Sequence, residues 1–141
     1  MGRGLLNGRT AIVTGAGQGL GQAIAREYAD EGAALVLLER NPVTLNATAD
    51  ELRSKGALVL PIALDLTDYD AYRKAISEAA DQLGHLDILV NNAAIAFYGT
   101  ILEDSLEEWR AQITVNLEAI YMGTKIVAPY MVKQQFGRVI N

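Results

Sequence analysis

A loop with four glycines, T-G-A-G-Q-G-L-G at residues 14–21, is the part of the sequence with the clearest chemical potential. It follows a short β-branched run and leads into residues whose apolar positions recur at helical spacing. Glycines let the backbone turn tightly and approach a ligand without clashes from Cβ atoms. The start of a helix adds free N–H groups and a positive dipole end, which suit a pyrophosphate. The loop is predicted to bind nucleotide phosphates, and a glycine-rich turn without a ligand is the alternative.

Strand and helix patterns alternate along the chain and set the frame for this loop. Short apolar runs predict strands at residues 10–14, 34–38, 58–64, 87–90 and from 138 onward. Amphipathic segments predict helices at residues 18–31, 42–55, 68–83 and 106–135. Near-continuous apolar strands that alternate with helices predict a parallel sheet covered on both faces. The handedness of such crossovers favours an α/β, doubly wound, Rossmann-type fold.

Several residues mark where these elements begin, end or bend. Pro61 lacks a backbone donor, which favours an edge position for its strand. Thr67 is predicted to cap the helix that follows it. Ser105 and Glu108 form a capping-box pattern at the start of the long helix. Pro129 lies inside that helix and is predicted to kink or break it.

Composition excludes several classes of function. The 141 residues hold 12 Lys and Arg against 17 Asp and Glu, a net charge of −5 that argues against nucleic-acid binding. The absence of cysteine excludes disulfides, thiolate metal sites and cysteine nucleophiles. A single histidine, His85, is a poor metal candidate, so no metal site is expected. Apolar stretches fall short of the roughly 20 residues that a bilayer requires, and we expect a cytoplasmic protein without membrane contact.

Four motifs in a fixed order resemble those of the classical short-chain dehydrogenase/reductases. The loop pattern is T-G-x-x-x-G-x-G, Asp65 follows the third predicted strand, N-N-A-A at residues 91–94 follows the fourth, and Asn116 lies in V-N-L of the long helix. The resemblance covers essentially the whole chain and implies the strand order 3-2-1-4-5. Ala94 is a departure, because the family usually has glycine at this position, and its methyl group is expected to tighten the loop without abolishing binding.

The resemblance implies three groups of residues that contact a dinucleotide cofactor. Around the pyrophosphate and the adjacent ribose are Gly15, Gln18, Gly19 and Leu20. At the adenine edge are Asp65 and Leu66. Along the adenosine ribose are Asn92, Ala93 and Ala94. Asn91 is expected to be mainly structural. The alternatives are that Asp65 caps the next helix and that both asparagines only satisfy the turn after their strand.

Glu39 and Arg40, at the end of the second strand, bear on the choice between NAD and NADP. An acidic residue about 20 positions after the glycine loop can bind both ribose hydroxyls of NAD and repel the 2′-phosphate of NADP. Arg40 stands where relatives that prefer NADP often place a phosphate ligand. NAD is the predicted cofactor because Glu39 is expected to face the ribose, and NADP is left open. The alternative is that the pair forms a solvated turn.

The catalytic groups that the resemblance implies are only partly matched. In the family a tyrosine in Y-x-x-x-K acts as the acid/base, a serine polarises the carbonyl, and an asparagine supports a proton-relay water. Asn116 matches this asparagine and is the predicted catalytic residue. Tyr121 and Lys125 fit Y-x-x-x-K, but they precede the fifth strand, whereas the family's pair follows it. Tyr121 is therefore assigned to packing, in the core or at an interface.

These observations lead to one functional hypothesis and two alternatives. Residues 1–141 are expected to be the dinucleotide-binding part of a longer single-domain enzyme, truncated before the family's later strands and inactive alone. That enzyme is expected to transfer a hydride between NAD(P) and a secondary alcohol or ketone, and to form a dimer or homotetramer through the long helix. The loop from Ile95 to Thr100, with Phe97 and Tyr98, is expected to border the substrate. The alternatives are a nucleotide-binding module without catalysis and an S-adenosylmethionine-dependent methyltransferase, against which N-N-A-A and Thr14 argue.

Overall fold

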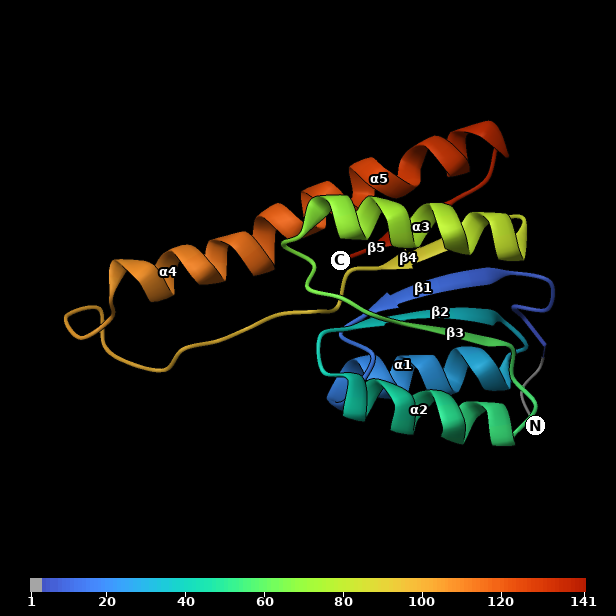
Figure 1. The fold of residues 1–141 in the computed structure, drawn as a ribbon, viewed down its shortest axis with the longest axis horizontal. Coiled ribbons are helices and arrows are strands. Elements are labelled where there is room, and N and C mark those ends of the chain that lie inside the picture. Colours follow the sequence, from blue (N-terminus) through green and yellow to red (C-terminus); the bar gives the residue numbers. More distant parts are fainter. Residues whose placement is uncertain (1–3) are drawn as a thin grey trace.

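The computed structural model describes residues 4–141 as a parallel sheet with helices on both faces (Figure 1). The strands are β1 (Thr10–Thr14), β2 (Ala34–Glu39), β3 (Val59–Ala63), β4 (Ile88–Val90) and β5 (Arg138–Ile140). The helices are α1 (Gly19–Asp30), α2 (Pro42–Ser54), α3 (Tyr69–Leu83), α4 (Leu106–Ile113), the π-helix η1 (Thr114–Glu118) and α5 (Ala119–Lys133). The sheet order is β3-β2-β1-β4-β5, which confirms the predicted topology.

Two apolar layers hold the helices on the sheet. Along β1, Ala11 and Val13 face the cluster that includes buried residues of α1 and α2. Ile12, between them, belongs to the opposite cluster, which includes buried residues of α3 and α5. Figure 1 shows these helix pairs on opposite sides of the sheet. Because both faces are buried, the strands are apolar throughout, as the sequence pattern indicated.

The chain reverses its direction of winding at β1, and this places a crevice at the carboxyl ends of the strands. β1 pairs with β2 on one side and with β4 on the other, and both pairings are parallel. The loops that follow β1 and β4 therefore leave in opposite directions from neighbouring strands. In open α/β sheets this switch point is where ligands bind.

Local signals in the sequence locate most of the element boundaries. Pro61 lies in β3, at an edge of the sheet among the described residues. The capping box of Ser105 and Glu108 is present at the start of α4. The predicted cap of α3 was wrong by one residue, because Asp68 and not Thr67 accepts the N–H of Ala71, at 3.0 Å. Thr67 is instead occupied with Asp65, to which its backbone N–H donates at 2.9 Å.

Pro129 does not break the long helix, so of the two outcomes predicted for it, a kink or a break, the break is wrong. α5 continues past this residue to Lys133, and Val127 and Met131, on either side of Pro129, are buried in the same apolar cluster. This packing holds the helix together across the hydrogen bond that proline removes. The irregular turn lies earlier, at η1, where the spacing widens to that of a π-helix.

The opposite end of the sheet, at the amino ends of β1 and β4, is joined by the buried carboxylate of Asp87. It accepts the backbone N–H of Thr10 at 2.8 Å and the guanidinium of Arg9 at 3.0 Å. His85 Nδ1 lies 2.7 Å from the same carboxylate. Asp87 therefore stabilises the pairing of two central strands far from the crevice. Within residues 4–141, no helix has the length and apolar character needed to cross a membrane.

Candidate nucleotide-binding site

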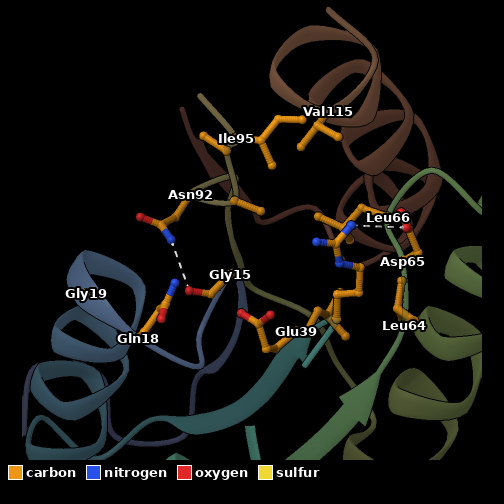
Figure 2. A pocket seen from close by; sticks show the side chains of 14 residues that line it. Gly15, Gln18, Gly19, Glu39, Leu64, Asp65, Leu66, Asn92, Ile95 and Val115 are labelled. Carbon is orange, nitrogen blue, oxygen red and sulfur yellow. Dashed lines mark hydrogen bonds and ion pairs between the residues drawn. The ribbon is translucent and has the colours of Figure 1, made fainter. Parts of the chain in front are cut away.

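A cavity of about 370 Å³ opens at the switch point, within the size range of small-molecule sites. Its lining is Gly15, Gln18, Gly19, Leu38, Glu39, Arg40, Leu64, Asp65, Leu66, Asn92, Ala93, Ala94, Ile95 and Val115. Figure 2 shows the glycine loop and the start of α1 on one side, and Leu64, Asp65 and Leu66 on the other. The cavity thus runs across the ends of β1 and β2 toward β3.

The glycine loop is shaped by close approaches that exclude side chains. Gly15 has φ +65°, and a Cβ there would lie 2.9 Å from the Cα of Ala93. A Cβ at Gly21 would collide with the carbonyl oxygen of Gly15. Gly19 also has a positive φ but borders open space, with nothing within 4 Å of such a Cβ. The loop is therefore tightly packed on its inner side and open where it meets the cavity.

The start of α1 offers hydrogen-bond donors to this cavity. α1 begins at Gly19, and its N-cap residue, Gln18, forms no side-chain hydrogen bond to the helix. The first turn of a helix has backbone N–H groups without intrahelical acceptors, at the positive end of the helix dipole. An anionic group such as a pyrophosphate fits this position, because it would accept from these groups.

Thr14 and Asn92 join the glycine loop to the segment after β4. The Thr14 hydroxyl accepts the N–H groups of Asn92 and Ala93, at 2.9 and 3.0 Å, and donates to the carbonyl of Val90 at 3.2 Å. The Asn92 side-chain amide donates to the carbonyls of Thr14 and Gly15, at 2.9 and 3.3 Å (Figure 2). These bonds fix the two walls of the cavity relative to each other, so Asn92 organises the site through its amide group.

Asn91, the first residue of the N-N-A-A motif, is directed away from the cavity lining. It is 9% exposed, and its amide donates to Asn141 at 2.8 Å and to the hydroxyl of Thr124 at 3.5 Å. Its contacts connect β4 with the end of β5 and with α5. They agree with the structural role expected for Asn91.

The charged residues of the cavity form two separate arrangements. The Glu39 carboxylate accepts the N–H of Gly17 at 3.3 Å and that of Asn41 at 3.0 Å. Arg40 Nη1 lies 4.0 Å from a carboxylate oxygen of Asp65. Hydrogen bonds from the backbone and the hydroxyl of Thr67, together with the charge of Arg40, lower the pKa of Asp65. Asp65 is therefore ionised at neutral pH. The alternative that Asp65 caps α3 is wrong, because the N-cap residue of α3 is Asp68.

Of the residues predicted to contact the cofactor, all but Leu20 line the cavity. The Leu20 side chain is 70% exposed and its backbone belongs to the first turn of α1. Asn116 is also outside the lining. Its side-chain amide forms two hydrogen bonds with the backbone of Ile95. Its Oδ1 accepts the Ile95 N–H at 2.9 Å and its Nδ2 donates to the Ile95 carbonyl at 2.8 Å.

Four apolar lining residues were not among the residues predicted to bind the cofactor, although Ile95 begins the loop expected to border the substrate. They are Leu38, Leu64, Ile95 and Val115. Leu38 and Leu64 stand directly before Glu39 and Asp65, so their positions at strand ends could have indicated them. Nothing in the sequence pattern brings Val115 of the long helix to the loop after β4.

Tyr121 and Lys125 lie on an exposed part of the long helix. The Tyr121 side chain is 61% exposed, and its hydroxyl is 3.5 Å from Lys125 Nζ. Neither residue lines the cavity. The expectation that Tyr121 packs in the core of this chain is wrong, because Tyr121 is not on the buried face of α5, which is formed by Ala119, Gly123, Ile126, Val127 and Met131. A packing role at an interface stays a prediction.

Comparisons with known proteins agree with this architecture. A family model described as short chain dehydrogenase matches residues 9–141. The 2,5-dichloro-2,5-cyclohexadiene-1,4-diol dehydrogenase LinX of Sphingobium indicum is 38% identical over 136 residues, covering 96% of this chain and 54% of that protein. A short chain dehydrogenase/reductase from Burkholderia phymatum, solved in complex with NAD, superposes with a TM-score of 0.92 at 30% identity, over 96% of this chain and 48% of that one.

A second solved structure has the other nicotinamide cofactor. A metagenomic short-chain oxidoreductase in complex with NADP superposes with a TM-score of 0.91 at 37% identity, over 96% of this chain and 62% of that one. The chain spans about half the length of the curated relatives it matches. The family model, in contrast, extends over nearly all of the 141 residues. The chain belongs to the short chain dehydrogenase family.

Proposed function

We propose that this chain is the cofactor-binding part of an oxidoreductase that transfers a hydride between NAD(P) and a secondary alcohol or ketone. The observation that carries the proposal is the glycine loop opening onto the start of α1, with acidic Glu39 in the same cavity. The NAD and NADP complexes of similar structures support the choice of cofactor. The diol dehydrogenase among the relatives supports an alcohol as substrate class.

In this proposal, different residues of the cavity bind different parts of the cofactor. The pyrophosphate lies at the N–H groups of the glycine loop and the first turn of α1, which includes Leu20 through its backbone. Glu39 binds the adenosine ribose, and Asp65 and Leu66 border the adenine. Ala93 and Ala94 form the wall beside the ribose, and Asn92 holds that wall against the loop. The bound nicotinamide would supply or accept the hydride.

We propose NAD as the preferred cofactor because of how Glu39 and Arg40 are engaged. A carboxylate has about four acceptor sites, and the N–H groups of Gly17 and Asn41 occupy two of those on Glu39. Two acceptor sites remain for the two ribose hydroxyls of NAD. A 2′-phosphate at the same place would meet a negative charge, and the nearest guanidinium, on Arg40, is turned toward Asp65.

Asn116 is proposed as the support for proton transfer during the reaction. Its side chain holds the Ile95 backbone from η1 and so fixes the loop that borders the cavity. We propose that the serine and the Y-x-x-x-K pair of the family belong to the remaining part of a longer enzyme. Residues 1–141 alone would then bind cofactor without turnover.

Assembly is proposed from the surface of the same chain. Several large apolar side chains of the long helix, Leu106, Trp109, Leu117 and Tyr121, are exposed. A surface of this kind suits a contact with another protein surface. We propose that the enzyme is a homo-oligomer, a dimer or tetramer, whose subunits contact each other through this helix. We also propose that it is cytoplasmic.

A fluorescence titration tests the proposed function. We expect NADH to bind the chain more tightly than NADPH, and S-adenosylmethionine to have no effect. Glu39→Gln should weaken NADH binding and reduce its advantage over NADPH by about tenfold, which corresponds to ~1.4 kcal/mol. Glu107→Gln, an exposed carboxylate on α4, is the matched control and should bind as the wild type does. A response to S-adenosylmethionine but not to NADH would support the methyltransferase alternative.

A further inference from the structure

Gly17, at the tip of the glycine loop, is held from its outer side. Its N–H donates to Glu39 at 3.3 Å, and its carbonyl accepts the hydroxyl of Thr48 at 3.4 Å. A Cβ at Gly17 would lie 2.5 Å from the Thr44 hydroxyl oxygen and 2.8 Å from Cγ of Glu39. Gly17 is not part of the cavity lining. The tip of the loop therefore rests on the first turns of α2, with its N–H bound by Glu39 of the cavity lining and its carbonyl bound by Thr48, outside that lining.

Thr48 is the buried centre of this contact. It lies in α2, its exposed fraction is 0%, and it does not line the cavity. Its hydroxyl accepts the side-chain amide of Gln22 in α1 at 3.0 Å. Its single proton lies within reach of two carbonyls, those of Thr44 at 3.1 Å and Gly17 at 3.4 Å. One hydroxyl thus connects the glycine loop with both helices that flank it.

We propose that Thr48 is a positioning residue for the pyrophosphate of the cofactor, acting through Gly17 without touching the ligand. This inference rests on the proposed function. A loop of glycines has many accessible conformations, and holding it in the binding conformation before the ligand arrives lowers the entropic cost of association. Thr48 and Glu39 fix the two polar groups of one residue, while Thr44 limits the space around it.

The contact between Thr48 and Gly17 should affect the binding of the pyrophosphate but not the binding of the adenosine. In the proposed binding mode the loop meets the phosphates and the adenine lies toward Asp65 and Leu66, which Figure 2 shows on the opposite side of the cavity from Gly15, Gln18 and Gly19. Loss of the Thr48 hydroxyl should therefore weaken ligands that contain a pyrophosphate. Adenosine, which has none, should bind with unchanged affinity. A purely structural role of Thr48 would not distinguish these ligands.

The test measures the dissociation constants of NADH, ADP and adenosine for Thr48→Val and Thr48→Ser. Val keeps the shape but removes the hydroxyl, and we expect NADH and ADP to bind about threefold to tenfold more weakly, the effect of one lost hydrogen bond. Ser keeps the hydroxyl and should bind all three ligands as the wild type does. Ser54→Ala, at the exposed end of α2, is the matched control. Thr48→Ala serves the same comparison if the Val variant does not fold.

The outcomes separate this inference from the proposed function. Wild-type protein that binds no NADH would overturn both. Wild-type binding together with unchanged NADH affinity in Thr48→Val, an equal loss for adenosine, or an equal loss in Thr48→Ser would overturn the positioning role alone.

Discussion

Glu51 of α2 carries the strongest charged contact between the two helices that flank the glycine loop. The guanidinium of Arg26, in α1, donates to both carboxylate oxygens, with Nη2 at 2.7 Å and Nε at 2.9 and 3.1 Å. Lys55 lies 3.0 Å from the same carboxylate. The hydrogen bond from Arg26, followed by that from Lys55, lowers the pKa of Glu51 to about 2. The carboxylate is thus bound more strongly in its ionised form in the folded chain.

This contact predicts how stability depends on acid. The ordinary pKa of the glutamate is 4.5 and its folded value is about 2. The contribution of Glu51 is therefore complete above pH 4.5 and is lost as the pH falls toward 2. Thermal melts should show a smaller loss of stability over this range in Glu51→Gln than in the wild type. Glu78→Gln, which changes an exposed pair within α3, should keep the wild-type slope. Equal slopes in all three proteins would contradict the assignment.

At the scale of elements, the strands and the glycine loop could be predicted because their signals are local. Apolar β-branched runs marked β1, and the sequence after Thr14 has glycines where close backbone contacts require them. The π-turn at η1 could not be predicted, because it is associated with a tertiary contact. Asn116 binds the backbone of Ile95, which is distant in sequence. Val115, which lines the cavity together with Ile95, was missed for the same reason.

The contact made by Asn116 can be tested as a link between elements. Asn116→Ala removes both hydrogen bonds to Ile95 and leaves a part-buried N–H without its acceptor. We expect the free energy of unfolding to fall by about 1–3 kcal/mol. The Ile95 amide should also exchange its hydrogen faster with solvent. Gln112→Ala, in α4 before η1, should change neither measurement. Unchanged exchange at Ile95 in the Asn116 variant would show that the loop is held by other contacts.

At the scale of the whole molecule, the buried Asp87 carboxylate and the proposed cofactor cavity lie at opposite ends of the sheet. Asp87 joins the amino ends of β1 and β4, whereas the cavity lies at their carboxyl ends. Asp87→Ala leaves the Thr10 N–H and the Arg9 guanidinium without this acceptor, so we expect a loss of about 2–4 kcal/mol in denaturant unfolding. Asp81→Ala, on the exposed side of α3, should lose much less.

The Asp87→Ala variant also tests whether the Asp87 end of the sheet influences cofactor binding at the cavity end. At temperatures where Asp87→Ala stays folded, its dissociation constant for NADH should equal that of the wild type. A change of tenfold or more would show that the two ends are coupled through the sheet.

Amide hydrogen exchange of the purified chain, with and without saturating NADH, is the most direct test of whether this cavity binds the cofactor. We predict slower exchange at Gly15, Gln18 and Gly19 of the glycine loop and at residues 92–95 after β4, all of which line this cavity. Exchange near Asp87, at the other end of the sheet, should not change. Unaltered exchange in both cavity segments, or protection confined to the Asp87 end, would contradict the assignment of this cavity as the NAD(P) site.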